Sequence, residues 1–146
     1  MRVWSLSACA ERADYKHNAD VTAGCRFGDK DCVLCDENGA IVRIAVRGSA
    51  MRAEELGIVP FRVGACRQIA SNLLALIDEA EGAIHIFDTD LLCLVNTIGD
   101  RRYTTLRLSE PPLKRLLPVV VAGTRDGHAV FMELHLSQQH QQLQQQ

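Results

Sequence analysis

The chain has 146 residues, of which 47% are hydrophobic and 23% charged, and its formal net charge at pH 7 is −2. This is the balance of one ordinary globular domain. The slightly negative net charge argues against a protein that binds nucleic acid through a broad basic face, but it does not exclude a local basic patch. No apolar run approaches the roughly 18 residues that span a bilayer, and the start of the chain is a poor secretory signal. We therefore expect an intracellular protein, cytoplasmic or nuclear, with no membrane partner and with reduced cysteines.

Short apolar segments rich in β-branched residues alternate along the chain with polar turns, which predicts strands. In chain order they are expected at residues 2–6, 21–27, 32–35, 40–46, 61–69, 73–77, 83–87, 91–98, 103–108, 117–122 and 129–134. Residues 7–20 are polar, and residues 109–115 contain Pro111-Pro112, which favours a loop. Residues 47–56 contain helix formers and are compatible with one helical turn or with a degenerate outer strand.

Three of these strand pairs enclose the same kind of turn, in which an acidic residue is followed by glycine. The turns run from Asp36 to Gly39, from Asp78 to Gly82 and through Asp126-Gly127, and their glycines are 43 and then 45 residues apart. Asn38-Gly39 is a strong hairpin signal because both positions tolerate a positive φ. A repeat of about 40–45 residues with several strands is typical of a β-propeller blade.

The order of these motifs resembles the WD40 repeat. His17 stands at the Gly-His position that opens such a repeat, Phe87-Asp88 resembles its Trp-Asp ending, and Trp4-Ser5 resembles the same ending at the start of the chain. The resemblance covers residues 2 to about 134, and it implies structural roles rather than chemical ones for the positions that match. Those positions are Trp4, His17, Asp36, Gly39, Asp78, Gly82, Phe87, Asp88, Asp126 and Gly127.

Counting strands in this frame gives a third and a fourth strand near the start, two four-stranded blades, and three strands of another blade. The expected fold is thus all-β, with antiparallel blades of a WD40-like propeller, about three to three and a half in number and not closed. Propellers typically close with four to eight blades, so we interpret the chain as a propeller segment or fragment at 1–136. Residues 137–146 are glutamine-rich low complexity, which predicts a disordered tail.

A propeller segment points to a protein-interaction scaffold rather than to an enzyme, and we expect neither a cofactor nor a metal. Arg101, Arg102 and Arg125 fall near turns between strands, where propellers dock partners, and are the candidate partner-binding residues. The expected partners are other proteins, possibly including the missing blades of the same propeller. An alternative is a propeller part of an RNA-processing or ribosome-assembly complex that contacts RNA through local basic residues.

A third alternative is a metal- or redox-active protein that uses the Cys32-Val33-Leu34-Cys35 motif. Zinc sites of this type carry a second ligand pair, which this sequence lacks. Residues three apart in an extended strand point to opposite faces, so buried structural cysteines explain the motif better. For the core between blades we expect eight apolar residues. They are Leu34, Ile44, Leu76, Ile86, Phe87, Val120, Phe131 and Met132.

Overall fold

The computed structural model describes residues 2–5, 10–48, 50–109 and 119–133, with side chains for 15–48, 50–108 and 119–133. Every regular element in these ranges is a strand. The described residues contain no helix long and apolar enough to cross a membrane. The strands are β1 (Arg2–Ser5), β2 (Ala10–Asp14), β3 (Val21–Phe27), β4 (Asp31–Asp36), β5 (Ala40–Arg47), β6 (Ala50–Ile58), β7 (Val63–Ala70), β8 (Leu73–Asp78), β9 (Ile84–Asp88), β10 (Cys93–Ile98), β11 (Tyr103–Ser109), β12 (Val119–Thr124) and β13 (Ala129–Glu133).

These strands form antiparallel sheets whose order in space follows the order of the chain. The hairpin β1–β2 is followed by the four-stranded sheets β3–β6 and β7–β10 and by the three-stranded sheet β11–β13. We call the last three the first, second and third sheet. Each sheet is a meander in which every strand pairs with its neighbours in the sequence. The sheets therefore correspond to two complete blades with a partial blade on either side, as expected.

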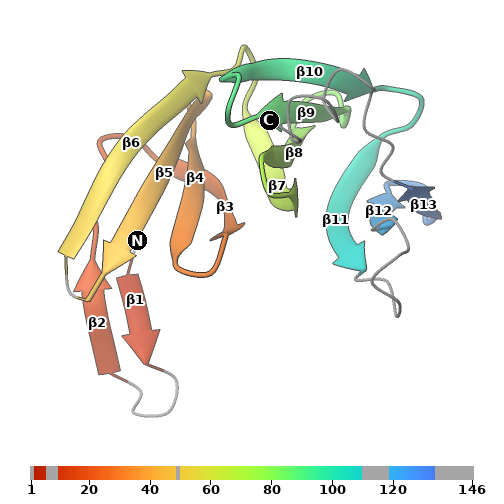
Figure 1. The fold of residues 1–146 in the computed structure, drawn as a ribbon. Helices are drawn as coiled ribbons and strands as arrows, with labels where there is room; N and C mark the ends of the chain where they lie inside the picture. Colours follow the sequence, from red (N-terminus) through yellow and green to blue (C-terminus); the bar gives the residue numbers. More distant parts are fainter. Residues whose placement is uncertain (1, 6–9, 49, 110–118, 134–146) are drawn as a thin grey trace.

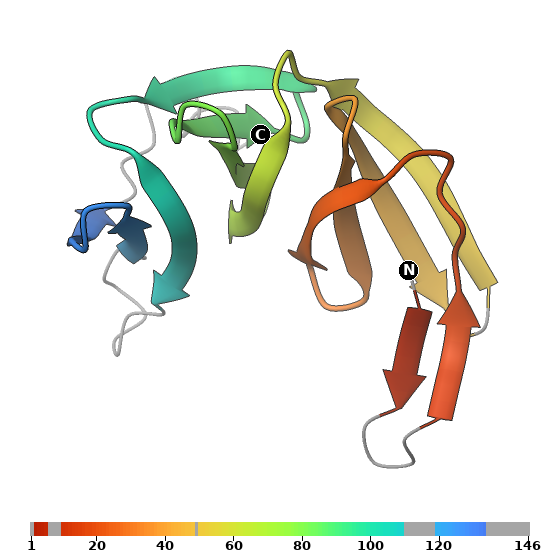
Figure 2. The ribbon, with the colours of Figure 1, turned by 180° about the vertical axis from the view of Figure 1, so that it is seen from behind.

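The sheets stand side by side along an open arc (Figure 1). Strands β6 and β10 lie on its convex side, and the first strand of each sheet lies on its concave side, where β7 contacts both β3 and β11. From behind, the N-terminal hairpin and the third sheet form the two ends of the arc (Figure 2). The fold is therefore an unclosed, propeller-like array, as expected.

Two elements differ in detail from the sequence expectation. Strand β2 occupies Ala10–Asp14, within the polar segment for which no strand was located. The 47–56 segment is an outer strand and not a helical turn, because β6 pairs with β5 along most of its length, with Arg43 opposite Glu54. The open edge of β5 gives this backbone hydrogen-bond partners, which outweighs the weak helix propensity of its residues.

Two clusters of buried side chains fill the spaces between neighbouring sheets. The first cluster joins the first and second sheets and includes Val33, Leu74, Leu76 and Phe87. The second joins the second and third sheets and contains Ile69, Leu73, Ala75, Ile77, Ile84, Ile86, Tyr103, Leu106, Val120 and Ala122. Burial of these apolar surfaces is the main force that holds the blades together.

The core prediction is right for most of its residues and wrong for one. Leu34, Ile44, Leu76, Ile86, Phe87 and Val120 are buried. Leu34 and Ile44 belong, with Val42, to a third cluster on the side of the first sheet that faces away from the second. Met132 is partly buried and packs against the second cluster. Phe131 is 72% exposed. Successive residues of a strand face opposite sides of the sheet, and Phe131 falls on the side of the third sheet that no further described sheet covers.

Candidate functional site

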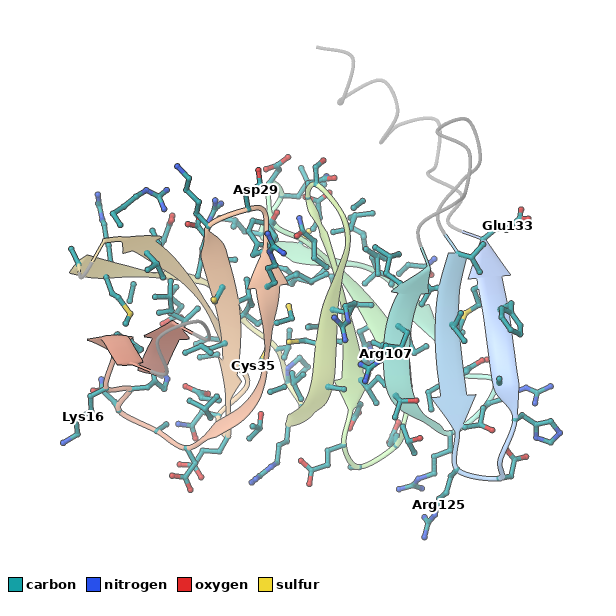
Figure 3. The ribbon with its side chains drawn as sticks, turned by 90° about the horizontal axis from the view of Figure 1, so that it is seen from below. Lys16, Asp29, Cys35, Arg107, Arg125 and Glu133 are labelled. Carbon is teal, nitrogen blue, oxygen red and sulfur yellow. The ribbon has the colours of Figure 1, made fainter. Side chains whose placement is uncertain are left out.

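One edge of the arc is built from the turns that carried the repeat signal, and we call it the turn rim. It consists of the turns at 36–39, 78–82 and 124–127 together with the connectors at 15–20, 59–62 and 99–102. Figure 3 shows Lys16 and Arg125 on this edge, whereas Asp29 and Glu133 lie on the opposite one. The rim gathers one turn and one connector from each successive sheet, which makes it a candidate docking surface.

The same backbone hydrogen bond recurs in each sheet on the rim. The amide N–H groups of Glu37, Glu79 and Arg125 donate to the carbonyl oxygens of Asp20, Arg62 and Arg102, each at 2.9 Å. Each of these bonds ties a turn to the connector that precedes the inner strand of its own sheet. The repeat inferred from glycine spacing is therefore also a repeat of hydrogen bonding.

The turn glycines have the backbone conformation that the sequence predicted. Gly39, Gly82 and Gly127 have φ of 83°, 72° and 90°, a region that residues with a Cβ rarely adopt. At Gly39 a Cβ would also collide with the carbonyl oxygen of Val59. The Gly39 oxygen accepts a hydrogen bond from the Val59 amide at 2.9 Å, so this glycine also lets the turn contact the connector to the next sheet.

His17 and Asp36, two of the positions that the WD40 resemblance covers, meet on the rim. The His17 Nε2 and the Asp36 Oδ2 are 2.8 Å apart. The other carboxylate oxygen, Oδ1, accepts the amides of Asn38 at 2.9 Å and Ala40 at 3.0 Å. Burial alone would raise the pKa of Asp36, but the hydrogen bonds from His17 and these two amides outweigh it and lower that pKa. The role of this pair is to brace the turn.

The other repeat positions also have local structural contacts. Oδ1 of Asp78 accepts the amides of Ala80 and Glu81 at 2.9 and 3.3 Å. Asp88 is 1% exposed, and its Oδ1 accepts the amides of Asp90 and Leu91. The Trp4 side chain lies outside the described side chains. The third turn has Thr124 where the other two turns have an aspartate. Its hydroxyl oxygen accepts a hydrogen bond from the His128 amide.

Asp126 lies at the tip of this third turn, where it bonds Thr124 and stands 3.1 Å from Nδ1 of His128. The hydrogen bond from Thr124 and then that from His128 lower the pKa of Asp126 to about 2. The carboxylate is therefore charged at neutral pH and contributes an acidic group to the rim.

The three predicted partner-binding arginines are all exposed and lie in one corner of the rim. Arg101 and Arg102 belong to the connector before β11, and Arg125 belongs to the β12–β13 turn, joined to it by the backbone bond described above. The Arg102 guanidinium also donates to the Ala80 carbonyl of the second sheet. Arg102 is thus partly engaged in holding the second and third sheets together, whereas the exposed side chains of Arg101 and Arg125 extend the basic corner.

A cavity of about 480 Å³ opens between the three sheets at this rim. Its lining combines Arg62 and Glu79, joined by an ion pair of 2.9 Å, with Thr22, Asp78, Arg102 and Tyr103. Burial, followed by the hydrogen bond to Asp100, raises the pKa of Tyr103 to about 12. This lining is mixed in charge.

The open end of the arc is a second candidate surface, which we call the end face. It is the outward side of the third sheet and carries Val119, Val121 and Phe131. Val121 pairs with Phe131 across the ladder just as Ala75 pairs with Ile86 in the second sheet. Ala75 and Ile86 are buried against the next sheet, at 1% and 9% exposure. The end face thus has the register of a blade interface, and none of the described sheets covers it.

The cysteines are arranged differently from the sequence motif. Cys32 and Cys35 both lie in the extended strand β4, and only Cys35 belongs to the first cluster. Instead, Cys66 on β7 lies beside Cys25 on β3 and Cys35 on β4. A hydrogen bond between the Cys25 and Cys66 thiols, together with burial, raises the pKa of Cys25. Among the described residues no group of histidine, cysteine and carboxylate side chains is placed to hold a metal ion.

Solved structures resemble this chain in fold alone. No family model matches the chain, and no curated protein matches it. Hsv2 of Kluyvelomyces marxianus, a β-propeller protein, aligns over 81% of this chain and 34% of its own at 17% identity, with a TM-score of 0.56. The computationally designed protein Ika8 aligns over 91% of this chain and 52% of its own at 15% identity, with a TM-score of 0.51. The chain therefore has a propeller-like fold, and it spans about a third of Hsv2 and about half of Ika8.

Proposed function

We propose that this chain is a protein-interaction segment of a β-propeller, with repeats of the WD40 type, and that it binds a further β-blade on its end face. The His17–Asp36 pair and the recurring rim hydrogen bond support the assignment of the repeat type. The observation that carries the function is the pair Val121 and Phe131, which occupies a position that is buried between blades elsewhere in the same chain. Intact proteins rarely leave such apolar surface open.

The partner chemistry follows from the interface that the chain already contains. The face that packs onto the second sheet presents Tyr103, Leu106, Val120 and Ala122 from two neighbouring strands. A partner for the end face needs a similar antiparallel sheet, with large apolar side chains on its inner strand and smaller ones on the next. A second propeller segment or a second copy of this chain can supply such a sheet.

The turn rim offers a second contact on the same partner or on another one. Arg101, Arg102 and Arg125 give its corner at the third sheet a positive charge next to the end face. Charges at the edge of an interface mainly speed association and select partners. An acidic surface beside the apolar contact of the partner would complement this corner.

Self-association provides the test of the end face without a known partner. We expect the mass from light scattering to rise with protein concentration, and Phe131→Ser to suppress that rise without lowering the melting temperature. Ile58→Ser is the matched control, since Ile58 is 67% exposed at the end of β6, away from the end face. A monodisperse monomer with one sharp cooperative melt would contradict the proposal, and so would equal effects of the two substitutions.

A further inference from the structure

The concave wall of the arc, formed by the inner strands β3, β7 and β11, carries only positive charge. These strands contain Arg26, Arg67 and Arg107 and neither aspartate nor glutamate. Elsewhere in the described chain, Arg43 and Arg47 pair with Asp31, and Arg62 pairs with Glu79. The arginines of the wall are thus set apart from the general mixture of charges on this protein.

Arg67 and Arg107 occupy equivalent positions on neighbouring strands. Arg67 lies opposite Ala75 in the second sheet, and Arg107 lies opposite Val121 in the third. Ala75 and Val121 are themselves equivalent, so the two arginines stand at the same level of the repeat, each on the inner strand of its sheet. Figure 3, which looks onto the concave side, shows Arg107 beside the boundary between β7 and β11.

Both side chains line one cavity of about 260 Å³. The remainder of its lining is mostly small or hydroxylated, with Ala23, Gly24, Gly64, Ala65, Thr104 and Thr105 among its residues. The small residues leave room above the inner strands, and the threonines add hydroxyl donors. A tetrahedral oxyanion fits such a volume with space for water.

The hydrogen-bonding capacity of the two arginines is largely unused. The Nε of Arg67 is buried and has no hydrogen-bond partner in the described chain, which is costly for a charged donor. Among the described residues, Arg107 donates only to the Leu106 carbonyl, at 3.3 Å. Neither arginine takes part in an ion pair among the described residues. Cys66 in the lining and the neighbouring Cys25 provide no counter-charge, because both thiols have a raised pKa and stay neutral.

We propose that the cavity between Arg67 and Arg107 is a binding site for a phosphate group, either free or attached to a larger molecule. Two planar guanidinium groups at one level can each donate two parallel hydrogen bonds to a tetrahedral dianion. The anion would also relieve the repulsion between two like charges in a partly desolvated site. This inference is independent of the end face, because it rests on the concave wall alone.

Titration of the full chain with inorganic phosphate and, separately, with O-phosphoserine tests the site, by calorimetry at constant ionic strength in a chloride buffer. We expect saturable binding of at least one probe. Arg107→Gln should weaken it about tenfold or more, as expected for the loss of one charged donor pair, and Arg107→Lys should weaken it less. Arg107 is exposed, so these variants should fold normally; thermal melts verify this.

Arg52→Gln is the matched control, because it removes the same charge from an exposed position on the convex outer strand β6. It should leave binding unchanged. Binding of inorganic phosphate supports a free anion, whereas binding of phosphoserine alone supports a phosphate group carried by a larger molecule. No saturable binding of either probe would overturn the proposal, and so would equal losses in Arg107→Gln and Arg52→Gln.

Discussion

Truncation of Phe87 to alanine tests the register that places the first and second sheets against each other. Phe87 is 2% exposed and belongs to the first cluster. Its ring lies against the backbone of β6, since a Cβ on Gly57 would stand 3.2 Å from the ring Cζ. The ring therefore fills a space between the second sheet and the outer strand of the first.

The expected loss of stability combines two terms. Removing a buried phenylalanine ring from its apolar surroundings costs about 1.5–3 kcal/mol. A residual cavity of about 80 Å³ adds about 2 kcal/mol, at about 24 cal/mol per Å³. The backbone of Gly57 is held in place by the pairing of β6 with β5, so the cavity cannot collapse easily. We expect Phe87→Ala to lower the free energy of unfolding by about 3–5 kcal/mol.

Urea unfolding followed by far-ultraviolet circular dichroism measures this change. Phe131→Ala is the control, because it removes the same ring from an exposed position and should change the stability of the monomer by about 0.5 kcal/mol or less. Gly57→Ala adds a sign test. Alone, Gly57→Ala should destabilise the protein by crowding the Phe87 ring. In the double variant with Phe87→Ala it should be neutral or stabilising, because the added methyl group fills part of the cavity. A loss below about 1 kcal/mol in Phe87→Ala would refute the register.

Three further predictions concern the turns, the ion pairs and the thiols. Gly39→Ala should destabilise the protein by more than about 1 kcal/mol in the same urea assay, through the positive φ and the collision with the connector; an unchanged midpoint would contradict the turn geometry. Burial raises the pKa of Asp31, but hydrogen bonds from Arg47 and Arg43 outweigh it and bring that pKa below 3.8. The charged Asp31 therefore stabilises the protein above about pH 4, and this effect is lost as the pH falls through the lower pKa of the folded state. Thermal melts should show Asp31→Asn to be less stable than the wild type at pH 7, and the difference in melting temperature should shrink in acid. Iodoacetamide at pH 8 should label the exposed Cys93 well before Cys25, whose raised pKa and burial suppress the thiolate; equal rates by mass spectrometry would show that the cluster is open.

Residues whose structural role depends on neighbours close in the sequence were predictable from the sequence. The spacing of Gly39, Gly82 and Gly127 gave the repeat, because a turn that needs a positive φ restricts the residue type at one position. The resemblance marked His17 and Asp36 as repeat positions, and the structure shows that they pair with each other. The outer strand β6 was left open between two readings, since its residues carry a weak local preference and the edge of β5 settled its conformation.

The candidate sites depended more on tertiary structure. Cys66 of the second sheet lies beside Cys25 and Cys35 of the first. Cys32 and Cys35, which stand close in the sequence, fall on opposite faces of β4. Arg101, Arg102 and Arg125 do meet at one corner, because turns of equivalent position fall on the same rim. Arg67 and Arg107 are 40 residues apart, and no local pattern marks them as facing one cavity.

The sequence by itself determined the all-β class, the length of the repeat and the order of the strands. Alternation of apolar residues, turn chemistry and spacing all act within one hairpin at a time. The sequence could not determine which apolar residues are covered. Phe131 and Ile86 occupy the same position in their hairpins, and their local sequences predict burial equally well. Only the presence of a neighbouring sheet separates them, since burial is a property of the space beside a strand, and that space is filled by residues far away along the chain.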